Sequence, residues 1–436
     1  MKVERLNTIF KADPTKVILQ FFKMNERRSK NIVNKILALD ENIIKENLDS
    51  IYKEFSSRHK NFDESIIDNY ERVETYINNP ADLSKERKLL IGTYFSKEYS
   101  IESAALFNPS IVPHPDQNDV PSGQLKFIMS LRATGEGHIS SIKFREGIIS
   151  NEGEIEIIND SSFSVLPKKI KYAEEDILNK KLQLTNGTGP DKEDILSSNH
   201  KSRFDDFSLI SERVLFPNSP SESMGLEDAR FVKFFENGES KYYGTYTAYN
   251  GKTFRTQIIE TDDFKNFETG TLHGAMVQDK GMALFPRKIN GKYFITSRQD
   301  GENLFLMQSD NLYYWNESEL LLEPDKTWGF VQLGNCGSPI ETEKGWLLIT
   351  HAVGPFRKYV ISAILLDLDD PSKIIGSLNE PLIEPNEVER EGYVPNVVYS
   401  CGSLIHNKKL IIPYAMSDSS CGFAKVNVDE LLNKLS

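Results

Sequence analysis

A turn followed by a strand recurs from about residue 100 onward, and this repetition restricts the available folds more than any other feature of the sequence. Each copy has a short polar turn and then a strand rich in aromatic and β-branched residues. Copies begin at Asn237, Asn290, Glu343 and His406, and Leu125–Phe144 supplies another near the start. Spacings of roughly 50 to 60 residues between such units are typical of four-stranded blades around a central channel. The pattern therefore predicts a five-bladed β-propeller in a mainly β chain.

The first hundred residues follow a different pattern. Between residues 13 and 96, apolar residues recur at intervals of three and four, as at Val17 and Phe21, and this predicts amphipathic helices. We therefore predict an N-terminal helical extension over 1–99 and a propeller domain over 100–436. Helices of this kind commonly pack within a fold or associate with one another, so a homo-oligomer formed through them is an open expectation.

Residues from about Lys168 to Asp206 interrupt the strand pattern. They are polar and charged and include the turn-forming run Asn186-Gly-Thr-Gly-Pro. We interpret them as an excursion between strands that is partly helical or mobile.

Composition excludes several classes of function. The net charge of −12 and pI near 5.3 argue against a nucleic-acid partner, because such a partner requires a basic face. No apolar run approaches the roughly 20 residues of a membrane helix, and the first residues lack a signal-peptide core, so we expect a cytoplasmic protein that does not bind membranes. The three cysteines have no metal-binding or disulfide-framework spacing; they are Cys336, Cys401 and Cys421.

A cluster of charged residues, Gly225-Leu-Glu-Asp-Ala-Arg230, stands immediately before a strand-like run. Alternation along a strand would place Asp228 and Arg230 on one face and Glu227 on the other. Asp228 and Arg230 are therefore expected to point together into a site. The alternative is a surface ion pair, which contributes roughly 0–1 kcal/mol.

Other polar residues also stand at strand ends, and a propeller would bring such ends to one mouth of its channel. Carboxylates, amides, basic groups and aromatic rings together are typical of sugar sites, because hydroxyls form hydrogen bonds and pyranose faces pack on rings. We therefore predict a site for a small carbohydrate. Besides the charged cluster, its candidates are Arg132, Tyr246, Asn250, Lys280, Arg298, Asn335, His351 and Asn396.

Several of these candidates have a structural alternative that the sequence leaves open. Lys280 is also compatible with a solvated position beside Asp279, and Arg298 with an ion pair to Asp300. His351 ends an apolar strand, where a buried core histidine is common. The tryptophans fit core packing at least as well as a sugar platform; they are Trp315, Trp328 and Trp346.

The order of the motifs resembles glycoside hydrolase family 130, which contains β-mannoside phosphorylases and some β-mannosidases. The resemblance covers residues from about 100 to 436, and the helical extension resembles one found in some members. It is carried by Gly225-Leu-Glu-Asp-Ala-Arg230, Lys280-Gly-Met-Ala-Leu-Phe-Pro-Arg287, Ser309-Asp-Asn-Leu-Tyr-Tyr-Trp315, Gly345-Trp-Leu-Leu-Ile-Thr-His351, Leu365-Leu-Asp-Leu-Asp-Asp-Pro371 and Glu391-Gly-Tyr-Val-Pro-Asn396.

This resemblance implies roles for individual residues. Asp228 matches the general acid that protonates the glycosidic oxygen through a sugar hydroxyl, and Arg230 orients that acid or the sugar. Lys280, Arg298 and His351 match positions in the phosphate-binding neighbourhood. The sequence departs from the family pattern at three positions: Ala229 replaces a proline, Ser297 replaces a histidine, and Tyr393 replaces an acidic residue.

Two mechanisms follow from these roles. An inverting phosphorylase uses phosphate itself as the nucleophile and needs basic groups to hold it, so Lys280, Arg298 and His351, with Arg357 and Lys358 as outlying candidates, favour phosphorolysis to mannose 1-phosphate. An inverting mannosidase needs a base that activates water, for which Glu227 or Glu302 is the candidate. Neither mechanism requires a metal or another cofactor. A non-catalytic glycan-binding propeller is a third alternative.

Overall fold

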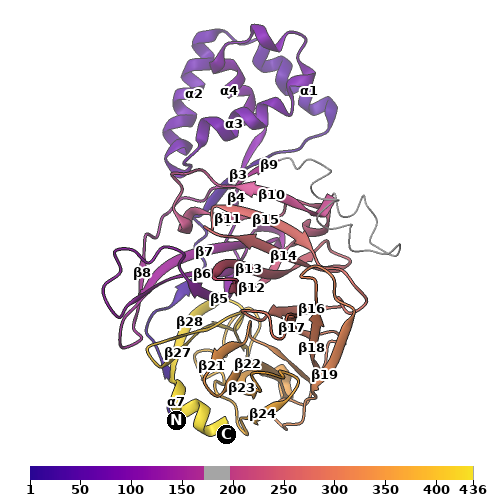
Figure 1. Cartoon of the computed structure of the whole chain (residues 1–436). Helices are drawn as coiled ribbons and strands as arrows, with labels where there is room; N and C mark the ends of the chain where they lie inside the picture. The colour runs from indigo at the N-terminus through magenta and orange to yellow at the C-terminus, as the bar shows by residue number, and fades with distance from the viewer. Residues whose placement is uncertain (171–196, 436) are drawn as a thin grey trace.

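The computed structural model of the chain describes residues 1–170 and 197–435. Its fold is mainly β, as predicted, with the helices between residues 26 and 94 at one end, the sheets below them and the C-terminal helix at the opposite end (Figure 1). Residues 171–196 of the predicted excursion, which include Asn186-Gly-Thr-Gly-Pro, lie outside the described residues. None of the helices within the described ranges is long and apolar enough to cross a membrane.

Between residues 26 and 94, four α-helices form a unit with an apolar core of its own. They are α1 (Glu26–Leu37), α2 (Glu41–Phe55), α3 (Phe62–Glu71) and α4 (Lys85–Tyr94), at the top of Figure 1. The side chains of Asn25, Asp40 and Ser84 each accept a backbone N–H at a helix start, which satisfies a donor that the helix leaves free. Every helix contributes to the core, for example through Val33, Ile44, Ile66 and Leu90.

The segment leading into these helices is β-strand. β3 (Val17–Phe21) pairs antiparallel with β4 (Ser96–Ser100), so the helices stand on a two-stranded stem. The helical interpretation of Val17 and Phe21 is therefore wrong, and the extension over 1–99 is not helical throughout. β-Branched residues such as Val17 and Ile18 suit a strand. The pairing partner comes from a distant part of the chain, which local periodicity does not reveal.

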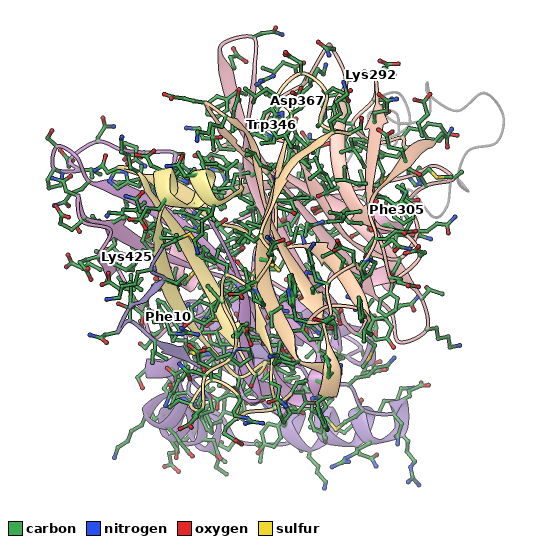
Figure 2. All side chains as sticks on the ribbon, turned by 90° about the horizontal axis from the view of Figure 1, so that it is seen from below. Phe10, Lys292, Phe305, Trp346, Asp367 and Lys425 are labelled. Atoms are coloured by element: carbon green, nitrogen blue, oxygen red, sulfur yellow. The ribbon has the colours of Figure 1, made fainter. Side chains whose placement is uncertain are left out.

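The first residues of the chain extend the C-terminal sheet. β1 (Glu4–Arg5) and β2 (Phe10–Lys11) both pair with β28 (Ser420–Asn427). Figure 2 shows Phe10 and Lys425 along this edge. The two ends of the chain are thus joined in one sheet, which contains β25 (Val398–Tyr399), β26 (Leu404–His406) and β27 (Lys409–Met416) and is followed by α7 (Val428–Leu435).

The largest sheet has eleven strands and joins two antiparallel groups. One group consists of β5 (Ala105–Pro113), β6 (Leu125–Thr134), β7 (Ser140–Ile149) and β8 (Ile155–Ile158). The other consists of β12 (Gly225–Glu236), β13 (Glu239–Tyr249), β14 (Phe254–Thr261) and β15 (Asn266–Thr271). A parallel pairing of Gly225 with Ser140 connects them. Further strands are β9 (Lys168–Ile170), β10 (His200–Arg203) and β11 (Val214–Leu215).

Two smaller antiparallel sheets follow along the chain. The first contains β16 (Lys280–Leu284), β17 (Tyr293–Arg298), β18 (Leu304–Ser309) and β19 (Glu317–Leu322). The second contains β20 (Gln332–Asn335), β21 (Ile340–Thr342), β22 (Gly345–Val353), β23 (Tyr359–Leu366) and β24 (Ile374–Ser377). Trp315 and Trp346 are fully buried in the cores of this region, so they serve packing. The arrangement of the sheets as five blades stays a prediction.

Candidate active site

A β-bulge at the start of β12 shapes the charged cluster. The register between β12 and β13 shifts between Glu227 and Arg230, and Asp228 has a positive φ of 53°. The regular alternation predicted for this run is therefore wrong, because the bulge turns both acidic side chains towards one neighbour. Arg132 on β6 places Nη2 2.8 Å from Glu227 Oε1 and Nη1 3.2 Å from Asp228 Oδ1.

Asp228 is buried among donors and cations. Asn108 Nδ2 donates to Asp228 Oδ1 at 2.7 Å, and Arg230 Nη1 donates to the Asp228 carbonyl oxygen at 2.7 Å. Burial opposes ionisation, but Arg132, Arg230 and Lys280 outweigh it and lower the pKa of Asp228 to about 2. With no ligand bound, Asp228 is thus a carboxylate at neutral pH.

A small pocket opens beside this carboxylate. Lys280 and Arg298 line it from facing positions on β16 and β17. Lys280 Nζ lies 3.7 Å from Glu227 Oε2 and 4.8 Å from the centre of the Phe254 ring. The residues around the pocket are Asp228, Arg230, Lys280, Gly281, Arg298, Gly334, Asn335, His351 and Tyr399.

Arg298 forms a long ion pair with Asp279 rather than the predicted pair with Asp300. Its Nε is buried and has no hydrogen-bond partner among the described residues, with Asp279 Oδ2 3.7 Å away. The alternative partner Asp300 instead accepts backbone N–H groups from Glu302 and Asn303. The Arg298 Nε–H thus has no hydrogen-bond partner among the described residues, although Arg298 lines the pocket.

Arg230 is fixed by the neighbouring strands. Its Nε donates to Asn335 Oδ1 at 3.0 Å and its Nη2 to the Tyr399 hydroxyl at 2.6 Å. The Asn335 amide in turn donates to the carbonyl oxygens of Gly281 and Thr296, at 2.6 and 3.2 Å. Asn335 thus joins β12, β16, β17 and β20 at the floor of the pocket, so it positions Arg230.

His351 lines the pocket as a neutral imidazole. Burial, with the charges of Arg298 and Arg230, lowers the pKa of His351 to about 3. Nδ1 lies 3.0 Å from the Asn335 carbonyl oxygen. Since a carbonyl can only accept, Nδ1 carries the proton and Nε2 has the lone pair. His351 is therefore uncharged at neutral pH, and its role in binding phosphate stays a prediction.

Tyr246 and Asn250, predicted to bind substrate, have structural roles outside the pocket. Tyr246 is buried in the core behind β13, and its hydroxyl contacts Glu222 and Gln257. Asn250 closes a turn, where its Oδ1 accepts from the backbone of Thr253 at 2.8 Å. Both residues were predicted to bind substrate because they stand near the end of a strand. The Tyr246 side chain instead points into the core, and the Asn250 side chain stabilises a turn.

The remaining candidates lie around the site. Asn396 does not line the pocket, but its carbonyl oxygen accepts from the Tyr359 N–H at 3.0 Å and its φ is 64°. Glu302 is exposed and outside the pocket lining. Arg357 holds its guanidinium 5.6 Å from the Tyr359 ring centre, whereas Lys358 forms an ion pair with Glu384 at 2.6 Å.

Three residues near Asp228 were missed by the sequence reasoning. Asn108 donates a hydrogen bond to Asp228, and the Tyr399 hydroxyl accepts one from Arg230. Asp418 lies in the turn between β27 and β28, and burial together with the negative charge of Asp228 raises the pKa of Asp418 to about 6, against the opposing effect of Arg132. In the sequence, Ser417-Asp418-Ser419 resembles an ordinary turn, so no signal distinguished it.

Comparison with known proteins identifies the class to which this site belongs. A family model for glycoside hydrolase family 130, described as beta-1,4-mannooligosaccharide phosphorylase, matches residues 194–436. Because this match spans more than half of the sequence, the chain belongs to glycoside hydrolase family 130 and is an enzyme.

Relatives of the chain carry phosphorylase names. A 1,2-beta-oligomannan phosphorylase from Thermoanaerobacter sp. (strain X514) is 34% identical over 229 residues, which is 52% of this chain and 76% of that protein. A beta-1,4-mannooligosaccharide phosphorylase from Ruminococcus albus is 30% identical over 207 residues, covering 45% and 62%.

Solved structures share the fold. One is a GH130 structure described with glycoside hydrolases that target beta-1,2 mannosidic linkages in Candida mannan; its TM-score is 0.53 at 20% identity, covering 76% of this chain and 87% of that one. A glycosyl hydrolase from Bacteroides ovatus has a TM-score of 0.52 at 17% identity, with the same coverage.

Proposed function

We propose that this chain is an inverting β-mannoside phosphorylase, which cleaves a β-mannosidic bond with inorganic phosphate and releases mannose 1-phosphate. The observation that carries the proposal is the pocket itself. It places one carboxylate, Asp228, beside the cationic side chains Arg230, Lys280 and Arg298, and Arg298 Nε has no hydrogen-bond partner there. A phosphate dianion fits such a set, since charge-assisted donors hold it.

The proposed reaction transfers one proton and exchanges one bond. Phosphate oxygen attacks C1 of the mannosyl unit, the C1–O bond to the leaving sugar breaks, and Asp228 supplies the proton that the leaving oxygen takes, through a sugar hydroxyl. The low pKa of Asp228 in the empty pocket is caused by Arg132, Arg230 and Lys280. A bound dianion offsets these charges, so we expect the pKa of Asp228 to rise when phosphate and sugar are bound.

His351 has a changed role in this scheme. With its proton on Nδ1, Nε2 accepts a hydrogen bond from a protonated phosphate oxygen, or takes up a proton when the dianion binds. Gln332 Nε2 lies 3.4 Å from the same nitrogen and limits the directions from which phosphate approaches it.

The hydrolytic alternative needs a base that activates water, and its two candidates suit that task poorly. Glu302 is exposed outside the pocket lining, and Glu227 is held by Arg132 at 2.8 Å and faces Lys280 at 3.7 Å. Both carboxylate oxygens of Glu227 therefore already face a cation. A purely glycan-binding role would leave the cation set around Asp228 without a function.

We also propose that the sheets form a five-bladed propeller over 100–436, with the pocket at one mouth of its channel. Contacts within or next to the first strands of successive groups support a closed circuit. They are Phe231 N to Ser110 Oγ at 3.1 Å, Phe235 N to Pro286 O at 2.8 Å, Asn335 Nδ2 to Gly281 O at 2.6 Å, the close approach of Gly337 to the Cys401 carbonyl, and Cys401 N to Pro109 O at 2.8 Å.

The test is phosphate dependence. The full-length protein is incubated with β-1,2- and β-1,4-linked mannobiose, with and without inorganic phosphate, and the products are separated. We expect mannose 1-phosphate that requires phosphate, and Asp228→Asn should lower its formation by about 10²–10⁴-fold with an unchanged circular dichroism spectrum. Release of free mannose at the same rate without phosphate would show that the enzyme is a hydrolase.

A further inference from the structure

Two strongly exposed aromatic side chains stand on loops beside the pocket, and the proposed reaction does not use them. Tyr393 is 63% exposed and Phe356 is 96% exposed. An exposed ring by itself is ordinary. These two are notable because the backbone around each is fixed and because both loops lead directly into the site.

Backbone contacts of the residues on both sides of Tyr393 fix its position. The next residue, Val394, donates its N–H to the Ser417 carbonyl at 3.0 Å, and Gly392 packs against the same carbonyl. This contact places Tyr393 beside the turn that carries Asp418. The charges of Asp228 and Arg132 act on the pKa of the Asp418 carboxyl. The Tyr393 ring also stacks on His138, with centres 6.1 Å apart and planes inclined by 29°.

The stem of the helical unit supports His138 in turn. His138 ends the short 3₁₀ turn Glu136–His138 between β6 and β7. The Tyr99 hydroxyl donates to the Glu136 carbonyl at 2.9 Å, and Lys97 forms an ion pair with the Glu136 carboxylate at 3.0 Å. The ring of Tyr393 is thus held on one side while most of it remains open to solvent.

Phe356 is presented by a constrained hairpin tip between β22 and β23. Phe356 and Arg357 both have positive φ, 56° and 55°, a conformation that costs free energy for residues other than glycine. Gly354 N–H bonds to the Lys358 carbonyl at 2.9 Å and closes the tip. A tip that served only to turn the chain would not need a phenylalanine in this conformation.

The same hairpin reaches the pocket through stacked rings. The Arg357 guanidinium lies over Tyr359, and the Tyr359 ring stacks on His351 with centres 5.8 Å apart and planes at 10°. The charge of Arg357 also acts on Asp418. The loops of Phe356 and Tyr393 therefore both lie beside the turn that carries Asp418, and they lead to His351 and Tyr399 of the pocket lining.

We propose that Tyr393 and Phe356 form a sugar-binding platform at the pocket mouth, which holds pyranose rings of the substrate beyond the bond that is cleaved. The substrate class is then β-mannan oligosaccharides longer than a disaccharide; this rests on the proposed function for the identity of the sugar. The C–H face of a pyranose packs on an aromatic ring, and His138, Arg357 and Asp418 offer polar groups to its hydroxyls. Two rings separated by charged side chains do not form the broad apolar patch of a protein interface.

Direct binding tests the platform without turnover. In full-length protein carrying Asp228→Asn, the Kd values of mannobiose and mannotetraose, each in the β-1,2- and β-1,4-linked form, are measured by calorimetry. We expect mannotetraose of one linkage to bind about tenfold more tightly than the disaccharide. Adding Tyr393→Ala or Phe356→Ala should remove most of that advantage, and Tyr393→Phe should retain it because the ring remains.

Phe207→Ala is the matched control, because Phe207 is 85% exposed and does not line the pocket; it should leave the tenfold advantage intact. Equal Kd values for the two lengths, or an advantage that survives both alanine variants, would overturn the platform, as would absence of mannoside binding. The platform and the phosphorylase assignment can fail separately. If mannotetraose binds more tightly only when both rings are present, but the wild type shows no phosphate-dependent turnover, the platform is supported and the phosphorylase assignment is refuted. If turnover depends on phosphate but the two substrate lengths bind equally, the phosphorylase assignment is supported and the platform is refuted.

Discussion

At the scale of single residues, the pocket combines a carboxylate with cations that it cannot neutralise alone. Asp228 is the one acidic residue of the pocket lining, whereas Arg230, Lys280 and Arg298 face the same space. Arg132 divides its guanidinium between Glu227 and Asp228. Arg132, Arg230 and Lys280 explain why Asp228 is ionised, although Lys280 also faces Glu227 and Arg298 also faces Asp279, each at 3.7 Å.

Lys280→Ala tests whether the cations of the pocket hold phosphate. Loss of one charged partner of a bound anion costs about 1.5–3 kcal/mol, so the KM for phosphate should rise by roughly 10- to 100-fold with a smaller change in the KM for the mannoside. Initial rates at varied phosphate measure this. Lys233→Ala is the control, because Lys233 lies on β12 of the eleven-stranded sheet and lines a different pocket. Equal rises in both KM values would contradict a phosphate-specific role.

His351 predicts a pH dependence of stability. Its pKa is about 3 in the folded protein, against an ordinary value near 6.5, so the unfolded chain binds more protons between these values. Stability should therefore fall as pH decreases below about 6.5, by at most about 1.4 kcal/mol per pH unit from this group. Thermal unfolding at pH 7.5 and 5.5 should show a larger loss of Tm for wild type than for His351→Gln. Parallel losses in the two proteins would exclude His351 as the cause.

At the scale of elements, the β12 bulge connects the sheet to the chemistry. Gly225 precedes it with φ 138°, and a Cβ there would lie 2.7 Å from the Ser140 nitrogen. Gly225→Ala should therefore destabilise the protein by about 1–3 kcal/mol and lower kcat by displacing Asp228. Gly238→Ala is the matched control, because Gly238 has φ 84° in the hairpin at the other end of β12 with open space around it. An activity loss as large in Gly238→Ala would contradict the role of the bulge.

Features set by nearby residues could be predicted from the sequence, whereas features set by pairing with distant strands could not. Turn residues such as Asn237 and Asn290 are locally encoded, and both adopt positive φ at hairpin turns. The bulge between Glu227 and Arg230 depends on the register with β13. The alternation of side chains along β12 could therefore not predict it. Tyr246 failed for a similar reason, since the partners that bury its hydroxyl, Glu222 and Gln257, come from other elements.

At the scale of the whole molecule, a buried charge network joins the helical unit to the main sheet. Glu102, which follows the stem, places Oε1 2.7 Å from Lys143 Nζ and 3.4 Å from Arg145 Nη2 on β7. Glu102 and Lys143 are completely buried. Burial, with Arg145 and Lys16 adding to it, lowers the pKa of Lys143 to about 7 although Glu102 opposes this. In the sequence these residues resemble ordinary surface charges, so the connection was not predictable.

Glu102→Gln should loosen this connection. It leaves the buried Lys143 without its carboxylate partner, and breaking a buried pair in this way costs about 3–5 kcal/mol, so the Tm should fall markedly. The double variant Glu102→Leu/Lys143→Met removes both charges and should be more stable than Glu102→Gln. Lys30→Ala, which removes an exposed ion pair with Glu26 on α1, should leave the Tm unchanged. If Glu102→Gln also leaves the Tm unchanged, the network does not hold the stem. If it lowers the Tm and the exchange of amide hydrogens also accelerates in β3 and β4, the stem is the part of the molecule that the network secures.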